Sequence, residues 1–232
     1  MNILQKGRKL SNLKILYETD SLVFALKPVG VLSEGASDSM TSLLSEYCGG
    51  EVFCVHRLDR AVSGVMVYAK DKKTAAYLSS LTANGSFKKE YLAVVHGKAE
   101  SGEMVDLLFK DSRTNKSFVV KKERKGVRKA KLEYETLAEK DGLSFVRIRL
   151  FTGRSHQIRV QFSSRKLPLY GDGKYGGSDN CDIALFSHRI SFDGENTGAV
   201  SVVAFPENTC PWDKFSITLK ELKRTVDEGM ML

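Results

Sequence analysis

Residues 56–64 read HRLDRAVSG, a charged turn placed directly before an apolar run from Gly64 to Lys70. The run is rich in Val, Met and Tyr, which is typical of a buried strand. Asp59 therefore lies in a predicted loop at a strand edge, where a rigid scaffold often presents functional groups. Spacing alone leaves two interpretations about equally favoured: a surface ion pair with a neighbouring arginine, worth under about 1 kcal/mol, or a functional carboxylate stabilised by an arginine.

A second polar stretch, GRSHQIRVQF, occupies residues 153–162. It predicts a helix over 155–164, in which Ser155 caps the first amides. Arg159 follows His156 by three residues, so the two lie on neighbouring parts of one helix face. A planar guanidinium suits bidentate pairing with a carboxylate or phosphate. For His156, a satisfied structural histidine is favoured over general acid–base catalysis.

The net charge of +8 is concentrated in one segment. Between residues 110 and 131 there are ten basic residues against two acidic ones, and the remainder holds 36 − 10 = 26 basic and 28 − 2 = 26 acidic residues. A local cluster of this kind favours a polyanion such as RNA, because each neutralised phosphate releases counterions. The alternative is a solvated hairpin whose lysines only keep the chain soluble.

Composition points to a globular protein in the cytoplasm that does not interact with membranes. A content of 42% hydrophobic residues is enough for a substantial core. The apolar runs are too short to cross a bilayer, and the first residues have no apolar stretch of signal-peptide length. The four cysteines form no CxxC pair, so free thiols are expected and a zinc site is not.

The predicted elements give an α+β pattern in a single domain, 1–232, on a mixed, mainly antiparallel sheet flanked by helices and loops. Strands are predicted at 22–27, 64–70, 90–96, 116–122, 131–137, 145–150 and 199–204, and helices at 40–47, 72–81 and 155–164. Asp71 is the predicted N-cap of the second helix. The basic segment at about 110–131 is predicted to be a hairpin turning at Lys125-Gly126.

Two further stretches carry weaker signals. Tyr91 in KKEYLAVVHG, at 88–97, could stack on a base, but a tyrosine at this spacing is more often part of a core. The loop GDGKYGG at 171–177 is rich in glycine but matches no known nucleotide-binding loop.

Taken in order, five motifs resemble the RluA-type family of RNA pseudouridine synthases: LKPVGV at 26–31, HRLDRAVSG, KKEYLAVVHG, GRSHQIRV and LPLYGDGKYGG. The resemblance implies the pseudouridine synthase fold, with Asp59 as the catalytic aspartate and Arg57 as the neighbour that helps to open the RNA stack. It also implies that Tyr91 lies against the target base and that Arg159 is the partner of Asp59. Val62 stands where the family usually has Thr, and Gln161 where His is common.

The resemblance implies RNA as the partner, either ribosomal, slightly preferred, or transfer RNA, and a reaction without cofactor or metal. We expect a monomer and no S4-type RNA-binding domain before the body, so that RNA selection falls to the catalytic domain and its basic hairpin. The residues expected to bind RNA are Arg57, Arg154, His156, Lys121, Lys122, Arg124 and Lys125.

Two alternatives to a synthase are considered. One is a metal-dependent phosphoesterase using His56, Asp59, His156 and Asp172; it is disfavoured because the sequence has no HxH or HxxxH pair. The other is an RNA-binding module or RNA chaperone without catalysis, in which the motifs serve only the fold.

Overall fold

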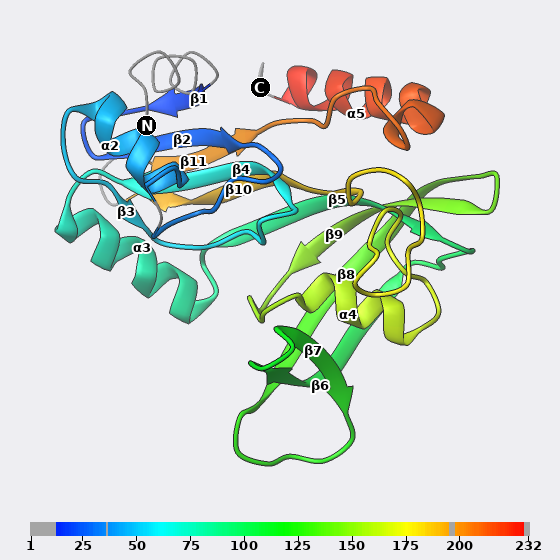
Figure 1. Ribbon diagram of the computed structural model, residues 1–232. Helices are drawn as coiled ribbons and strands as arrows, with labels where there is room; N and C mark the ends of the chain where they lie inside the picture. Colours follow the sequence, from blue (N-terminus) through cyan, green and yellow to red (C-terminus); the bar gives the residue numbers. More distant parts are fainter. Residues whose placement is uncertain (1–12, 36, 195–197, 230–232) are drawn as a thin grey trace. The chain divides into compact units, whose positions relative to one another are not determined.

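The computed structural model describes residues 13–35, 37–194 and 198–229, which divide into two compact units (Figure 1). Unit 1 comprises residues 1–89 and 187–204, and unit 2 comprises residues 90–186 and 205–232. Compact units occur within one domain as well as between domains, so the single-domain interpretation stays a prediction. The expectation about an S4-type domain concerns the chain before Leu13, outside the described residues.

Unit 1 is a sheet in the strand order β1-β2-β4-β10, with β3 paired to β4 and β11 paired to β10. Its strands are β1 (Lys14–Glu18), β2 (Leu22–Lys27), β3 (Phe53–Cys54), β4 (Ser63–Ala69), β10 (Leu185–Gly194) and β11 (Gly198–Val203), and its helices are α2 (Met40–Cys48) and α3 (Lys72–Asn84). Helix α3 begins as predicted, because the Asp71 carboxylate accepts a hydrogen bond of 2.8 Å from the Thr74 N–H.

The core of unit 1 consists of side chains that alternate along its strands and pack against α3. Phe192 stacks on Phe24 and Phe87, with ring centroids 6.2 and 5.5 Å away. Gly64 brings β4 close to β10: a Cβ at this position would lie 2.3 Å from the Ser187 carbonyl oxygen. The glycine that follows the Asp59 turn therefore fixes where that turn leaves the sheet.

Unit 2 is a sheet in the order β5-β9-β8-β6-β7, with helix α4 on one face. Its elements are β5 (Lys88–His96), β6 (Gly102–Asp111), β7 (Lys116–Val120), β8 (Val127–Lys140), β9 (Leu143–Leu150), α4 (Gln157–Ser164), the 3₁₀ helix η1 (Trp212–Phe215) and α5 (Ser216–Gly229). In unit 1 the strand pairs β1–β2, β2–β4, β3–β4 and β10–β11 are antiparallel, and in unit 2 so are β6–β7, β6–β8 and β8–β9. The predicted α+β class and mainly antiparallel pairing are confirmed.

The basic segment is not the predicted hairpin. Strand β7 pairs with β6, and β6 pairs on its other side with β8, so β6 lies between the two strands predicted to be partners. Residues 121–126 therefore cross from one side of β6 to the other, ending at Gly126 with a φ of 86°. The prediction failed because β6 has apolar residues on both faces, Leu107 through Phe109, and shows no strict alternation.

Within the described residues, no helix is long and apolar enough to span a membrane.

Candidate active site

The loop that carries Asp59 is held by backbone hydrogen bonds within unit 1. The Ser33 hydroxyl donates to the Leu58 carbonyl and accepts from the Leu58 N–H, both at 3.0 Å. The Val62 N–H donates to the Asp59 carbonyl at 3.0 Å. Atoms on both sides of Asp59 are therefore fixed, while its side chain is only partly buried. This arrangement presents a carboxylate from a rigid turn, as the sequence predicts.

Lys27, at the end of β2, joins this loop to the neighbouring loop at 28–31. Its fully buried side chain donates from Nζ to the carbonyls of Pro28 at 2.9 Å, Val31 at 2.7 Å and Arg60 at 3.3 Å. Burial lowers the pKa of Lys27 to about 8, and the nearby Asp59 carboxylate opposes that shift. The ammonium group thus organises three carbonyls and places a positive charge near Asp59.

Arg60 completes the connection, because its Nε donates to the Gly30 carbonyl and its own carbonyl accepts from the Gly30 N–H, both at 2.8 Å. Arg57 is also exposed, with 72% of its side chain accessible, and it forms an ion pair with Glu34 at 3.3 Å. An exposed guanidinium beside the Asp59 turn is compatible with the expected contact to RNA, and the role of Arg57 stays a prediction.

His56 at the start of the turn is neutral and serves as an acceptor. The Val67 N–H donates to its Nε2 at 3.2 Å, so the ring proton is on Nδ1, which is buried without a hydrogen-bond partner. Desolvation, with a smaller contribution from the Lys89 charge, lowers the pKa of His56 to about 3. His56 therefore anchors the turn to β4.

This shift predicts an acid-sensitive fold. In the unfolded chain a histidine takes up its proton near pH 6.5, whereas folded His56 resists protonation down to a pKa of about 3, so stability falls as pH drops below 6.5. Between pH 7 and pH 5 the wild type is expected to lose about 2 kcal/mol more unfolding free energy than His56→Gln, whose amide oxygen can still accept from Val67. Urea unfolding at both pH values measures this, and parallel losses would contradict it.

In unit 2, Tyr91 lies within β5 and is 5% exposed. Strand β5 also anchors the segment that contains the glycine-rich loop. The Val94 carbonyl accepts a hydrogen bond from the Tyr170 N–H at 2.9 Å, and the Val94 N–H donates to the Ala184 carbonyl at 3.1 Å. The chain on both sides of that loop, at Tyr170 and at Ala184, is thus fixed to the strand that carries Tyr91. Its expected place against the target base stays a prediction.

Arg159 on α4 forms a buried bidentate ion pair with Asp172 of the glycine-rich loop. Its Nε donates to Asp172 Oδ2 at 2.8 Å and its Nη2 to Oδ1 at 2.7 Å, with 8% and 0% of the two side chains exposed. Two of the five guanidinium N–H groups are used in this way. Pairing of Arg159 with Asp59 stays a prediction.

The rest of the GRSHQIR motif builds the entry to α4. The helix begins at Gln157 rather than at 155, because His156 has a left-handed φ of 54° and serves as the N-cap without a side-chain hydrogen bond. The predicted cap by Ser155 is therefore wrong. Gln157 Oε1 instead accepts from the Arg154 N–H at 3.1 Å, which closes the turn. The Arg154 side chain is exposed, with its Nε donating to the Lys129 carbonyl at 3.0 Å.

Tyr175 connects α4 to β7. Its hydroxyl oxygen accepts from the Ser117 N–H at 2.7 Å and lies 2.8 Å from His156 Nδ1. Its ring lies under the Arg159 guanidinium, with 5.1 Å between the ring centroid and Cζ. The contact between the Tyr175 hydroxyl and His156 Nδ1 supports the interpretation of His156 as a structural histidine.

Three of the four residues considered as phosphoesterase ligands, His56, His156 and Asp172, are engaged in these other contacts. His56 Nε2 accepts from a backbone N–H, and both Asp172 oxygens accept from Arg159. Among the residues that the structure describes, no group of three or more His, Cys, Asp or Glu residues is arranged to hold a metal ion. The four cysteine thiols are free.

A family model described as RNA pseudouridylate synthase matches residues 21–164, more than half of the 232 residues. The chain belongs to this RNA pseudouridylate synthase family. The match includes Asp59, Tyr91 and Arg159, whereas Asp172 lies beyond its end. The predicted resemblance is confirmed.

The chain is similar to curated proteins and to solved structures, of which two proteins and one structure are described. A ribosomal large subunit pseudouridine synthase D of Borreliella burgdorferi is 29% identical over 83% of this chain and 65% of that protein. A tRNA pseudouridine synthase C of Vibrio cholerae is 28% identical over 77% of this chain and 80% of that protein. Human RNA pseudouridylate synthase domain containing 4 has a TM-score of 0.77 at 20% identity, covering 94% of this chain and 98% of that chain.

These comparisons confirm the pseudouridine synthase fold. The chain spans between 55% and 65% of the length of three of the curated relatives that it matches.

Three residues that contribute to the site were not assigned to a synthase site from the sequence: Lys27, Tyr175 and Asp172, the last of which was considered only as a phosphoesterase ligand. Lys27 had a visible signal, because a lysine ending the apolar run LVFALK needs internal acceptors if it is buried. Asp172 stands between two glycines in GDGKYGG, a loop whose tight approaches allow no side chain: a Cβ on Gly177 would lie 2.3 Å from the Leu169 carbonyl oxygen. The glycines serve to place Asp172 against Arg159 rather than to bind a nucleotide.

Proposed function

We propose that this protein isomerises specific uridines of structured RNA to pseudouridine and that Asp59 is its catalytic carboxylate. The observation that carries the proposal is the fixed Asp59 turn, held through Leu58 and Val62 and lying near the Lys27 ammonium, in a chain of the RNA pseudouridylate synthase family. Rigid presentation of one carboxylate is what a single-residue catalyst requires.

The reaction needs no added group. The N1–C1′ bond of uridine breaks, the uracil turns, and a C5–C1′ bond forms while the hydrogen on C5 leaves as a proton and N1 gains one. Asp59 would act as the nucleophile that holds the ribose, or as the base in an elimination route. Atoms and electrons balance without a cofactor, so the protein needs only to bind, orient and shield the uridine.

The target base has to leave the RNA stack, which costs a few kcal/mol. Arg57, exposed beside the Asp59 turn, is proposed to support the opened stack. Tyr91 is proposed to hold the uracil while it turns, and Arg159, oriented by Asp172, is proposed to stabilise the Asp59 carboxylate. Arg154 and His156 are proposed to contact the RNA backbone at the entry to α4.

Tritium release tests this proposal, because the hydrogen on C5 has to leave when the C5–C1′ bond forms. RNA carrying 5-tritiated uridine is prepared as unmodified ribosomal and transfer RNA pools and incubated with the full chain. We propose ribosomal RNA as the slightly preferred substrate, supported by similarity to a ribosomal large subunit synthase over 83% of the chain. Release from the ribosomal pool alone is the expected result, and release from transfer RNA alone would reverse the preference.

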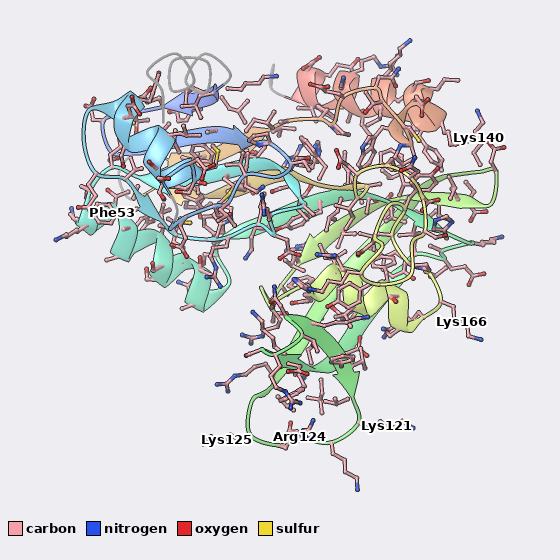
Figure 2. All side chains as sticks on the ribbon, in the orientation of Figure 1. Phe53, Lys121, Arg124, Lys125, Lys140 and Lys166 are labelled. Atoms are coloured by element: carbon pink, nitrogen blue, oxygen red, sulfur yellow. The ribbon has the colours of Figure 1, made fainter. Side chains whose placement is uncertain are left out.

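The basic loop, residues 121–126, supplies the separate prediction about RNA affinity. Lys121, Lys122, Arg124 and Lys125 are exposed, and Figure 2 labels three of them at the tip of this loop. Changing all four to Gln is expected to weaken RNA binding and to reduce the slope of log K against log salt by up to about 3, because each lost phosphate contact removes about 0.7.

The matched control changes four exposed lysines on two helices, Lys72, Lys73, Lys220 and Lys223, to Gln. It removes the same charge but is expected to leave the slope near that of the wild type. Equal slopes for the wild type and the loop variant, measured by fluorescence anisotropy, would restore the interpretation of a solvated loop.

The alternative function is an RNA-binding module or RNA chaperone without catalysis. Such a protein would use the same fold and the same basic loop to bind RNA, and Asp59 would have no catalytic role. RNA binding without tritium release from any RNA tested would favour it.

A further inference from the structure

Unit 2 has a second face that the proposed reaction does not use. Residues directly opposite each other in antiparallel strands point to the same side of a sheet. Phe109 of β6 lies opposite Phe118 of β7 and Val127 of β8, and Leu107 lies opposite Val120 and Lys129. We call the following set the open face: Val105, Leu107, Phe109, Phe118, Val120, Val127, Lys129, Lys131, Arg149 and Phe151.

The alternating residues of the same strands face α4 and form a core. Leu108 and Ala130 are buried there against Val160 and Tyr175. Near the basic loop, none of the residues that the structure describes covers the open face in this way, and Val105, Phe118 and Phe151 are 43%, 42% and 40% exposed.

Farther along β9, the side of the sheet that carries the open face is closed. Phe145, on the same side of β9 as Arg149, packs against Trp212 and Phe215 of η1, with ring centroids 6.0 and 5.4 Å away. At this end of the sheet, an aromatic side chain on the same side as the open face is buried because η1 packs over it. At the other end the aromatic rings of Phe118 and Phe151 are exposed among the described residues, as is typical of interaction sites.

The charges on the open face identify the chemistry of that partner. Arg124 lies over the Phe109 ring at 4.5 Å, and Lys131 and Arg149 lie over the Phe151 ring at 5.0 and 4.9 Å. Two acidic residues lie on the same side of the sheet, Glu103 opposite Glu133 and Glu133 opposite Arg149, and both are ion-paired with Lys131. Toward the loop, the face therefore alternates aromatic rings with cations, which complements bases joined by phosphates.

A hollow of about 410 Å³ lies between the basic loop and this face. Its lining combines the apolar side chains of Leu107 and Val127 with the cationic residues Arg124, Arg128 and Lys129, and Glu123 is its one acidic residue. That volume is within the range of about 300–1,000 Å³ for small-ligand clefts. An apolar floor with cationic walls suits an unpaired base and its phosphate.

We propose that the open face binds an unpaired RNA segment flanking the target uridine. Bases stack on Phe118 and Phe151, one base enters the hollow beside Arg124, and phosphates lie at Lys129 and Arg149. Strand spacing puts Phe118 and Phe151 about 20 Å apart, enough for a short run of nucleotides. The proposal rests on the proposed function for its RNA substrate, and it adds a specificity surface for single-stranded sequence next to the modified site.

The test uses the full chain and two probes, a single-stranded RNA of about ten uridines and the same RNA annealed to its complement. The double variant Phe118→Leu, Phe151→Leu keeps apolar surface but removes the flat rings. It is expected to bind the single strand at least about tenfold more weakly with an unchanged salt slope, because both flat rings on which bases stack are lost while the charges stay. Tyr47→Leu, which removes an exposed ring on α2, is the control and should bind as the wild type does.

A second variant, Lys129→Gln with Arg149→Gln, should instead flatten the salt slope for the single strand. The phenylalanine variant should not change binding of the duplex by a comparable factor, because paired bases are not available for stacking. Wild-type affinity of the double phenylalanine variant for the single strand would overturn the proposal. So would a change from dimer to monomer in sedimentation with RNA binding intact, which would make the open face a contact between two copies of this chain.

Tritium release separates this proposal from the proposed function. Release by the wild type together with unaltered single-strand binding by the phenylalanine variant would overturn the open-face proposal and leave the enzyme assignment standing. Weakened single-strand binding by that variant, with no release from any RNA, would support the open face and remove the assignment.

Discussion

The variant Asp59→Asn is expected to lose at least about 1,000-fold of tritium-release activity while keeping its fold and its affinity for RNA. Asparagine has nearly the shape of aspartate, and the change leaves in place the hydrogen bonds that the Ser33 hydroxyl and the Val62 N–H make to the backbone of the loop. The change removes only the anionic oxygen that the proposed reaction needs. Single-turnover release with excess enzyme measures the chemical step, and circular dichroism with anisotropy measures fold and binding.

The control for this variant is Asp20→Asn, a change at an exposed carboxylate outside the site. It should retain wild-type activity. If Asp59→Asn released tritium at a rate within about tenfold of the wild type, Asp59 could not be the catalytic group.

The variant Arg159→Met is expected to lower the free energy of unfolding by about 3–5 kcal/mol and to abolish activity. Methionine matches the length of the arginine stem but leaves Asp172, whose side chain is 0% exposed, as a buried charge without the bidentate partner. Urea unfolding measures the stability.

A double variant separates the two effects. Adding Asp172→Leu to Arg159→Met removes the buried charge and is expected to recover much of the lost stability without recovering activity. Arg165→Met is the matched control, since Arg165 forms a more exposed pair with Asp106 at 2.9 Å and should cost about 1 kcal/mol or less. Recovered activity in the double variant would show that the pair is structural only.

The sequence predicted elements well where one pattern dominated. Strand β2 matches at both ends and α2 within one residue, because apolar residues and an N-cap serine coincide with their boundaries. The sequence did not predict four elements: strands β1, β6 and β10 and helix α5. In β6 and β10, residues such as Leu108 and Phe186 are buried by tertiary packing that no local alternation records. The basic hairpin failed for the same reason, because strand pairing is a long-range property.

The site was predictable to the extent that its motifs are local. The Asp59 turn and Arg159 were located from short phrases, whereas the partner of a buried arginine depends on how a loop folds back. Asp172 reaches Arg159 across 13 residues of chain, through glycines whose close packing is visible only in three dimensions. His156 could not be predicted as the N-cap of α4, since a non-glycine residue with positive φ is uncommon.

Nucleoside analysis of the reacted RNA tests the central claim most directly, because the isomerisation changes connectivity without changing mass. RNA incubated with the wild type and with Asp59→Asn is digested and separated, and pseudouridine is counted against tritium released. If Asp59 catalyses the isomerisation, the wild type forms one pseudouridine per tritium released and the variant forms none. Tritium release without pseudouridine, or equal pseudouridine from both proteins, would contradict it.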